Sequence, residues 1–329
     1  MTASKAVTAV AGTNIALVKY WGKRDAVRIL PHQSSLSVTL APLEVVTTVE
    51  FGAPTDSVVL HGSEARGKER SRVLGLLERV RSETTRALGP VRVDSRGNFP
   101  MAAGLASSAA GFAALALAGR AAAGLSTDPA AISRLAREGS GSACRSVQGG
   151  VCIWHRGTRE DGADSVATQA FPEGHWPELR LLVAVLSRAE KEVGSRDGMA
   201  QTVETSPYYP AWVKDAEAEI PRATAAIAAR ELEALGALSE RNAWRMHATA
   251  FAADPPLCYL LPGTLALILA LPAARRRGVP VWFTLDAGPN PVLLTLASHE
   301  AEVERLAREA GALEVVRCRP GGDARLVEP

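Results

Sequence analysis

Three strand-like stretches precede the first helical segment of this chain, and that order most limits the folds open to it. Residues 6–10 (AVTAV), 34–40 (SSLSVTL) and 43–51 (LEVVTTVEF) are rich in valine and threonine, as β-strands are. The first helical pattern covers residues 69–88 and ends at Gly89 and Pro90, a strong stop signal. A strand followed directly by another strand argues against a doubly wound sheet, in which helices separate consecutive strands.

Strand-like and helix-like segments then alternate to the end of the chain, which predicts an α/β protein. Asp128 and Pro129 stand where a helix N-cap and a first-turn proline are expected. Strands are predicted at 91–95, 149–154, 179–187, 279–285, 291–296 and 313–318, and helices at 104–125, 128–139, about 210–250 and 298–311. The polar stretch 159–177 is typical of a junction, so we expect domains at 1–178 and 179–329.

Charge and composition exclude several classes of partner. The 37 basic and 35 acidic residues leave a formal charge of +2, too little to favour nucleic acid or a membrane surface, so any anion site must be local. Four cysteines without a C-x-x-C pair indicate reduced thiols in a cytoplasmic protein. The first residues lack the apolar core of a signal peptide. The most apolar segment, 257–274, is interrupted by Pro262 and Pro272, so we expect no membrane span.

A run of small residues before a helical pattern forms the first candidate anion site. In NFPMAAGLASSAAG, residues 98–111, Gly104 and the pair Ser107 and Ser108 lead directly into the helix. Free N–H groups at a helix N-terminus favour a phosphate, and serine hydroxyls bind phosphate oxygens or Mg²⁺. The alternative is an ordinary helix start at which serine caps the backbone.

A rival phosphate loop lies earlier in the chain. GSEARGKE, residues 62–69, nearly matches a nucleotide-binding P-loop but has Glu69 where that motif needs serine or threonine for the metal. A carboxylate at that position repels phosphate. We therefore predict only a turn before a helix.

Serines, glycines and basic side chains gather in three further segments. GSGSACRSVQGG, residues 139–150, offers hydroxyls, backbone N–H groups and Arg145 to an anion, with a surface turn as the alternative. NIALVKYWGKRD, residues 14–25, carries two lysines beside two aromatics, and its alternative is an ordinary strand edge. EKEVGSRDGM, residues 190–199, is interpreted as a turn with three potential anion ligands or as a solvated loop.

One carboxylate stands at the end of a predicted strand. In WFTLDAGPNP, Asp286 precedes a rigid glycine–proline turn that presents it either to a pocket or merely to its own backbone as an Asx-turn. No histidine pairs with it in a Ser-His-Asp pattern. His247 is interpreted as a satisfied helix residue, and nothing nearby activates Cys144 as a nucleophile.

Taken together, these segments resemble the diphosphomevalonate decarboxylases of the GHMP kinase superfamily. The resemblance covers nearly the whole chain and appears in the family's order. It rests on NIALVKYWGKRD, LPHQSSLSVTL, NFPMAAGLASSAAG, REGSGSACRS, GSRDGM, MHATAFAADPPLCYL and FTLDAGPNPVLL.

The resemblance implies a fold, a reaction and partners. The fold is α/β (α+β), with an N-terminal domain like ribosomal protein S5 domain 2, a C-terminal ferredoxin-like domain and the active site in the cleft between them. The reaction is the ATP- and Mg²⁺-dependent conversion of mevalonate 5-diphosphate to isopentenyl diphosphate, through transient phosphorylation of the 3-hydroxyl. A cytoplasmic homodimer is implied, with no nucleic acid or membrane partner.

Motif positions assign expected roles. The expected catalytic residues are Asp286, Lys19, Arg145 and Lys191. The expected substrate-binding residues are Tyr20, Trp21, Lys23, Ser140, Gly141, Ser142, Arg145, Ser195, Arg196 and Met199. The expected ATP-binding residues are Ser95, Asn98, Met101, Ala102, Ala103, Gly104, Leu105, Ala106, Ser107 and Ser108, with Ser107 also on the metal.

Several positions depart from the family pattern. Gly194 replaces a usual serine and Gln148 a usual aromatic, while His32, Gln33, Gly97 and Met101 also differ. None removes a catalytic group. The first two leave open a phosphomevalonate decarboxylase or a mevalonate kinase-type relative, whose substrate has another phosphorylation state.

Overall fold

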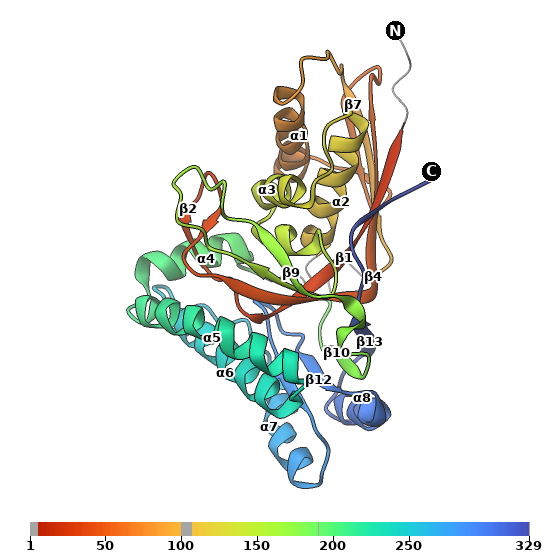
Figure 1. Ribbon diagram of the computed structural model, residues 1–329. Coiled ribbons are helices and arrows are strands. Elements are labelled where there is room, and N and C mark those ends of the chain that lie inside the picture. The colour runs from red at the N-terminus through yellow and green to blue at the C-terminus, as the bar shows by residue number, and fades with distance from the viewer. Residues whose placement is uncertain (1–5, 100–106, 190, 329) are drawn as a thin grey trace.

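A computed structural model describes residues 6–99, 107–189 and 191–328 as a mixed α/β protein (Figure 1). β1 (Val7–Val18) and β4 (Ser35–Phe51) pair antiparallel from Val7 opposite Val49 to Val18 opposite Leu36. This confirms the strand–strand start. The two segments predicted at 34–40 and 43–51 form one continuous strand, so no break separates them.

The remaining elements follow the predicted alternation only in part, because four helices come in succession between residues 195 and 276 and several strands follow one another directly. The further strands are β2 (Lys23–Asp25), β3 (Leu30–Pro31), β5 (Ser57–Leu60), β6 (Ser63–Glu64), β7 (Val91–Gly97), β8 (Val151–Trp154), β9 (Ala167–Phe171), β10 (Leu179–Val185), β11 (Trp282–Thr284), β12 (Val292–Leu296), β13 (Glu314–Pro320) and β14 (Arg325–Val327). The α-helices are α1 (Gly67–Ser82), α2 (Ser107–Ala122), α3 (Pro129–Gly139), α4 (Ser195–Thr205), α5 (Tyr209–Ala229), α6 (Leu232–Phe251), α7 (Pro262–Arg276) and α8 (Glu300–Glu309). Short 3-10 helices are η1 (Gly141–Ser146), η2 (Glu173–His175) and η3 (Ala297–His299).

Alanine allows α2 to lie close to the sheet. Its inward side chains are fully buried alanines, and the helix packs on β1 and β4. Because alanine side chains are short, the backbone approaches the strands closely. α1 and α3 pack beside α2 on the same side of the sheet (Figure 1). The predicted cap is confirmed, since the Asp128 side chain accepts a hydrogen bond from Ala131 N at the start of α3.

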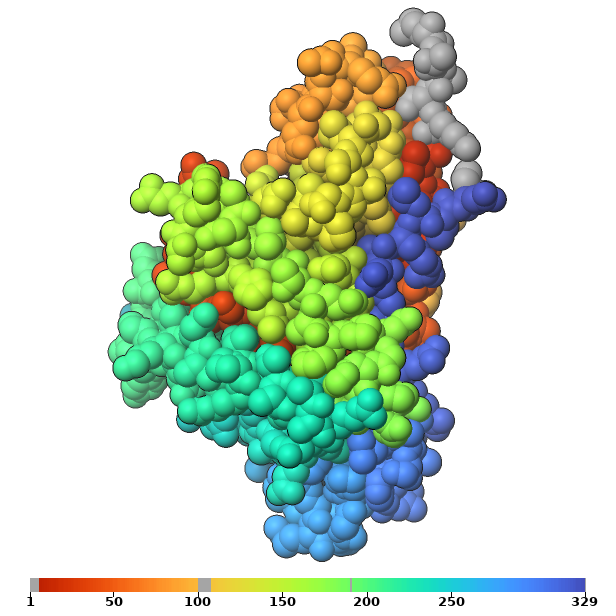
Figure 2. Space-filling model, viewed as in Figure 1, coloured from red at the N-terminus to blue at the C-terminus, as the bar shows by residue number. Residues whose placement is uncertain are grey.

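A single sheet continues through both halves of the chain. Among the described residues its main order is β11-β12-β10-β13-β4-β7-β5-β6, with β13 joined to β4 at Arg319 opposite Ala41. At the far end of the chain, β14 pairs with β1. Figure 2 shows this dark blue segment lying against the red N-terminal strand. The polar stretch 159–177 also contains a strand, β9, which pairs with β8.

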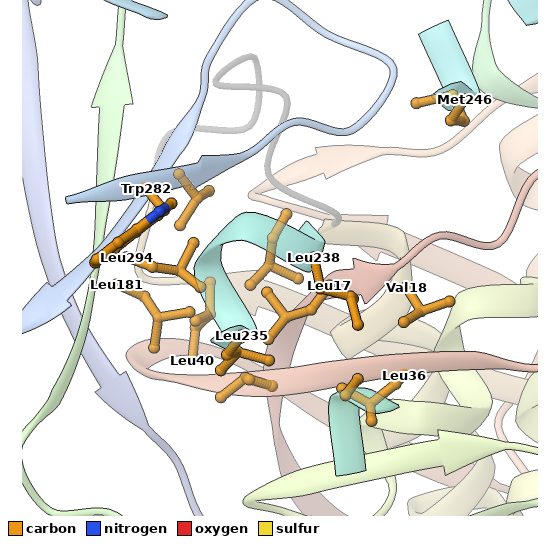
Figure 3. Close-up of a cluster of buried hydrophobic side chains, with 14 of the residues drawn as sticks. Leu17, Val18, Leu36, Leu40, Leu181, Leu235, Leu238, Met246, Trp282 and Leu294 are labelled. Atoms are coloured by element: carbon orange, nitrogen blue, oxygen red, sulfur yellow. The ribbon is translucent and has the colours of Figure 1, made fainter. Parts of the chain in front are cut away.

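A large apolar cluster lies where the two halves meet. It combines Leu17 and Val18 of β1 with side chains from β4, β10 and β12, and with Leu235, Leu238 and Met246 of α6 (Figure 3). α6 is therefore anchored on the strand that leads to Lys19. No helix among the described residues is long and apolar enough to cross a membrane.

Three predicted boundaries differ from the structure. α1 ends at Ser82 rather than at residue 88, because Thr84 and Thr85 are β-branched and disfavour a helix. The single helical region predicted at 210–250 is two helices, because Arg230 adopts a left-handed conformation with φ 57° that ends α5. Pro272 lies inside α7 and does not interrupt it.

Candidate active site

One cavity gathers residues from segments far apart in the sequence. Its volume is about 610 Å³, which lies within the usual range for a small-molecule site. Every predicted catalytic and substrate-binding residue lines it: Lys19, Tyr20, Trp21, Lys23, Ser140, Gly141, Ser142, Arg145, Lys191, Ser195, Arg196, Met199 and Asp286. Among the residues that the structure describes, its charged lining consists of six cations and a single carboxylate, namely Lys19, Lys23, Arg72, Arg145, Lys191 and Arg196 against Asp286. This local excess of positive charge fits a multiply charged anion.

Asp286 and Lys19 form the only ion pair across this lining among the described residues. Lys19 Nζ donates to Asp286 Oδ1 at 2.6 Å and to the Ala16 carbonyl at 2.7 Å. The Lys19 side chain is 2% exposed, whereas that of Asp286 is 36% exposed. Burial lowers the pKa of Lys19, and the Asp286 carboxylate opposes that shift. The carboxylate is thus tied to a buried cation on one side and open to a ligand on the other.

Two arginines converge on the last residue of α3. Arg72 Nη2 donates to the Gly139 carbonyl at 2.9 Å, and Arg196 Nη2 donates to the same oxygen at 3.5 Å. Ser140 continues directly from that carbonyl, and its Oγ lies 3.4 Å from Ser108 Oγ at the start of α2. Guanidinium groups, hydroxyls and backbone N–H groups together suit phosphate oxygens.

Gly141 has a steric reason to be glycine. A Cβ at this position would lie 2.7 Å from the Tyr20 hydroxyl oxygen, so a larger residue would displace that ring from the cavity wall. The Tyr20 hydroxyl is buried without a hydrogen-bond partner among the described residues, and burial raises its pKa. It therefore stays protonated and provides a free donor at the cavity wall.

Arg145 is buried at the base of the cavity and held by polar side chains. Its Nη1 donates to Ser35 Oγ at 2.6 Å and its Nη2 to Asn14 Oδ1 at 3.3 Å. Asn14 in turn donates to Ser146 Oγ at 2.7 Å, which fixes its amide. Arg145 Nε has no partner among the described residues. A buried donor that faces no protein acceptor is suited to an anionic ligand.

Residues 195–199 are helical where a turn was predicted. α4 begins at Ser195, so the prediction of a turn was wrong for residues 195–199. Asp197 lies in the first turn, where a negative charge favours a helix, and this signal outweighs the two flanking glycines. Lys191 Nζ donates to Ser195 Oγ and to the Ala287 carbonyl, both at 2.7 Å. The lysine thereby joins the start of α4 to the Asp286 turn.

A smaller, mostly apolar pocket adjoins this cavity at Arg72 and Ser108. Its volume is about 130 Å³, and its apolar wall comes from Val45, Leu60, Val73, Val93, Phe112 and Leu115. Ser95 also lines it and exchanges a 2.8 Å hydrogen bond with Thr47. A flat apolar group that carries an anionic tail fits the two spaces together.

Asn98 does not line either pocket. Its side chain accepts from Glu44 N and donates to the Pro42 carbonyl, so it supports the neighbouring strand. The predicted P-loop-like segment 62–69 is a turn, a short strand and the start of α1, and this confirms the turn before a helix. Its last residue, Glu69, lines the smaller pocket.

Part of the predicted phosphate loop lies outside the described residues. These residues are Met101, Ala102, Ala103, Gly104, Leu105 and Ala106. Ser107 begins α2, but its side chain also lies outside the description. Within the described ranges, no cluster of three His, Cys, Asp or Glu residues is placed to hold a metal ion.

Sequence reasoning missed two residues of this site. Arg72 lies in an amphipathic helical pattern that gave no functional signal, and only packing brings it to the junction of the pockets. Asn14 begins the quoted NIALVKYWGKRD motif, but its contact with Arg145 spans 131 positions. Local sequence spacing predicts neither the position of Arg72 nor the contact between Asn14 and Arg145.

Comparisons with known proteins cover almost the whole chain. Residues 11–167 match a family model described as the diphosphomevalonate decarboxylase-like N-terminal domain, and residues 181–313 match the mevalonate 5-diphosphate decarboxylase C-terminal domain. The chain is 41% identical to the diphosphomevalonate decarboxylase of Bos taurus, over 90% of this chain and 78% of that protein. It is 38% identical to the diphosphomevalonate decarboxylase of Ganoderma lucidum, over 91% of this chain and 80% of that protein.

Solved structures agree with these matches. The mevalonate diphosphate decarboxylase from Staphylococcus aureus superposes with a TM-score of 0.93 at 33% identity, covering 98% of each chain. A structure of MDDEF in complex with MVAPP, AMPPCP and magnesium gives a TM-score of 0.91 at 39% identity, covering 98% of this chain and 99% of that one. The GHMP kinase-type two-domain fold expected from the resemblance is therefore confirmed.

Proposed function

The chain belongs to the diphosphomevalonate decarboxylase family, and from that premise we propose that its cavity binds mevalonate 5-diphosphate beside ATP and Mg²⁺ and converts it to isopentenyl diphosphate. One observation carries this proposal most strongly. The Asp286–Lys19 pair, the buried Arg145 and residues 140–142 line the same cavity, next to a mostly apolar pocket.

We assign residues 140–142 and the start of α4 to the substrate diphosphate. Hydroxyl and backbone groups at residues 140–142, together with Ser195 and Arg196, offer donors to several phosphate oxygens. Tyr20, Trp21, Lys23 and Met199 line the remaining wall and would contact the mevalonyl chain. Arg145 would bind the substrate carboxylate through the donor that has no partner among the described residues.

The smaller pocket is assigned to the nucleoside. Its apolar wall suits a purine ring, and Ser95 lies on its floor. The ATP phosphates would then extend toward Ser108 and Arg72, where the two pockets meet. The start of α2, with the Ser107 backbone, directs N–H groups to that place. When bound, Mg²⁺ neutralises phosphate charge, and the assignment of Ser107 to the metal remains a proposal.

The chemistry requires a better leaving group than a tertiary hydroxyl. MgATP supplies the phosphoryl group that converts the 3-hydroxyl oxygen into a phosphate ester. Asp286 would orient that hydroxyl and accept its proton, while Lys19 and Lys191 offset the negative charge around the transferred group. Phosphoryl transfer has a loose transition state, so positioning and cationic stabilisation matter more than a strong base.

Decarboxylation then follows from the same geometry. Cleavage of the C3–O bond releases phosphate with its electron pair and leaves positive character at C3. The electron pair of the C1–C2 bond moves to form the C2–C3 double bond, and CO₂ departs. Arg145 would hold the carboxylate so that the breaking bond aligns with C3. The products are isopentenyl diphosphate, CO₂, ADP and phosphate.

Product stoichiometry tests this function. The purified chain, given MgATP and mevalonate 5-diphosphate labelled at C1, should release CO₂, ADP and phosphate in a 1:1:1 ratio. ADP release without CO₂ would contradict decarboxylation and indicate a kinase.

Exchanging Arg72 for glutamine is expected to raise KM for both substrates by about tenfold. Arg72 lines both pockets, and the loss of a hydrogen bond from a charged donor weakens binding by about this factor. Burial, with Arg196 nearby, lowers the pKa of Arg72 to about 10, so it is still cationic at neutral pH. Steady-state kinetics against each substrate provides the measurement. Arg79→Gln, on the same helix and paired with Glu138, is the matched control and should leave both KM values unchanged. An increase in only one KM would contradict the shared position.

Turnover is expected to decline on the alkaline side below pH 10.5, the usual lysine value. Burial lowers the pKa of both Lys19 and Lys191, so each loses its proton at a lower pH than a free lysine. Both side chains must be cationic for turnover. Activity is therefore full at a pH below both lowered pKa values and falls as the pH rises through them. A pH profile of kcat measures this. In Lys191→Arg the guanidinium stays protonated, so the decline should become less steep, with Lys19 alone left to lose its proton. A profile that stays flat up to pH 10.5 would contradict the requirement.

Three further features are proposed. A division at residues 178 and 179 is supported by family models that end at residue 167 and begin at residue 181. A cytoplasmic location accords with four cysteines that are all free thiols. A homodimer follows only from the family resemblance, and sedimentation equilibrium would test it directly.

A further inference from the structure

A carboxylate is fully buried outside both pockets. Glu219 of α5 is 0% exposed, and its Oε1 accepts a hydrogen bond from Arg241 Nε at 2.9 Å. Its Oε2 accepts from Asn242 Nδ2 at 2.6 Å. Asn242, on α6, is also 0% exposed, and neither residue lines a pocket. The described contacts thus place two buried polar groups behind the active site rather than in it.

The carboxylate fixes which way the Asn242 amide points. A carboxylate paired with arginine only accepts hydrogen bonds, so the Asn242 NH₂ group must face Glu219. The Asn242 oxygen is therefore left for the opposite side, where Lys19 N donates to it at 2.8 Å. The Lys19 carbonyl in turn accepts from Gln33 Nε2 at 3.2 Å. Side chains thus hold both backbone polar groups of Lys19.

Holding this backbone fixes where the lysine charge lies. Lys19 follows the last residue of β1, so no strand pairing beyond Val18 constrains it. Its Nζ bonds both Asp286 and the Ala16 carbonyl, and Thr284 Oγ1 donates to that same carbonyl at 2.9 Å. The strand ends that carry the lysine and the carboxylate are therefore joined through one oxygen. A shift of the Lys19 backbone would move the ammonium relative to Asp286.

Only the carboxylate of the Glu219–Arg241 ion pair is buried, because the Arg241 side chain is 40% exposed. Burying a charge costs free energy that its hydrogen bonds must offset, so stability alone does not account for a carboxylate at this position. α6 is already anchored by Leu235, Leu238 and Met246 in the core (Figure 3). A buried polar network fixes a unique geometry at its two ends, and here one end is the backbone of Lys19.

We propose that Glu219 and Asn242 are positioning residues that act through Lys19, setting the place of its ammonium beside Asp286. This inference rests on the proposed function. Neither residue touches a substrate, so their loss should lower the rate of the chemical step and leave substrate binding intact.

The test compares Asn242→Leu with a control on the same helix. Leucine keeps the volume but removes both hydrogen bonds. Ser239→Ala is the control, because Ser239 is equally buried one turn earlier and its hydroxyl has no partner among the described residues. We expect Asn242→Leu to lower kcat between about tenfold and 100-fold, with both KM values within about twofold, since small misplacements of catalytic groups have effects of this order. Ser239→Ala should retain the wild-type kcat.

A double variant separates positioning from general damage. In a Lys19→Met background there is no ammonium to position, so adding Asn242→Leu should change the remaining kcat by less than about twofold. Glu219→Gln gives a second route should Asn242→Leu fail to fold. Glutamine can donate to Asn242 and so permits its amide to flip, and we expect the same selective loss of kcat.

Several results would overturn the inference. These are a wild-type kcat in Asn242→Leu or Glu219→Gln, an equal loss with and without Lys19, or a rise in KM at constant kcat. CO₂ release by the wild-type chain, measured in the same assay, tests the proposed function separately. The inference depends only on the ratios of kcat between the variants and the wild type.

Discussion

Replacing Asp286 with asparagine is expected to lower kcat by about 10²–10⁴-fold while leaving both KM values nearly unchanged. Asparagine has almost the same shape, and its oxygen can still accept the hydrogen bond that Lys19 Nζ now donates at 2.6 Å. The amide cannot take up the proton of the 3-hydroxyl, and the negative charge that balances Lys19 is lost. Steady-state kinetics and CO₂ release provide the measurement.

The matched control is another aspartate paired with a cation. Asp94 accepts hydrogen bonds from Arg96 on β7 and lines neither pocket, so Asp94→Asn should keep wild-type kinetics. Wild-type turnover in Asp286→Asn would mean that the base is assigned wrongly. A large rise in KM with unchanged kcat would instead place Asp286 in substrate binding alone.

The second large effect is expected on replacing Arg145 with glutamine, which should lower kcat/KM by about 10²–10³-fold. Removing a preorganised hydrogen-bond donor from the active site of other enzymes has an effect of this size. Arg145 is fully enclosed, and its Nε has no partner among the described residues. Glutamine removes the charge that would hold the substrate carboxylate in line with the breaking bond. It also leaves Asn14 and Ser35 without their guanidinium donor.

Arg137→Gln provides the control for loss of a buried arginine. Arg137 is as deeply buried as Arg145 but donates to the Gly162 and Ser165 carbonyls, away from the cavity. We expect this variant to lower the melting temperature without reducing kcat/KM by more than about threefold. Equal kinetic losses in both variants would show that Arg145 acts only through stability.

Local sequence patterns predicted features whose cause is local. The cap at Asp128 and the glycine-rich segment after α3 each depend on backbone requirements within a few positions. Gly141, for example, lies where a Cβ would meet Tyr20. The family resemblance added the fold and the gathering of distant motifs, and the comparisons confirm the family.

Contacts across long stretches of sequence could not be predicted from patterns. The Lys19–Asp286 pair spans 267 positions and the Asn242–Lys19 bond spans 223, so both depend on how α6 and β11 pack on β1. Arg72 looked like an ordinary polar residue of an amphipathic helix. The turn predicted at Ser195 was wrong because Gly194 and Gly198 are typical of turns. The signal that favours a helix there is the negative charge of Asp197 in the first turn.

The most direct test of the account is a substrate panel. The purified chain is given MgATP with mevalonate, its 5-phosphate or its 5-diphosphate, and trapped CO₂ is measured for each. The six cations of the cavity predict that the 5-diphosphate gives by far the highest kcat/KM. Turnover of mevalonate alone, or CO₂ release mainly from the 5-phosphate, would contradict the proposed substrate.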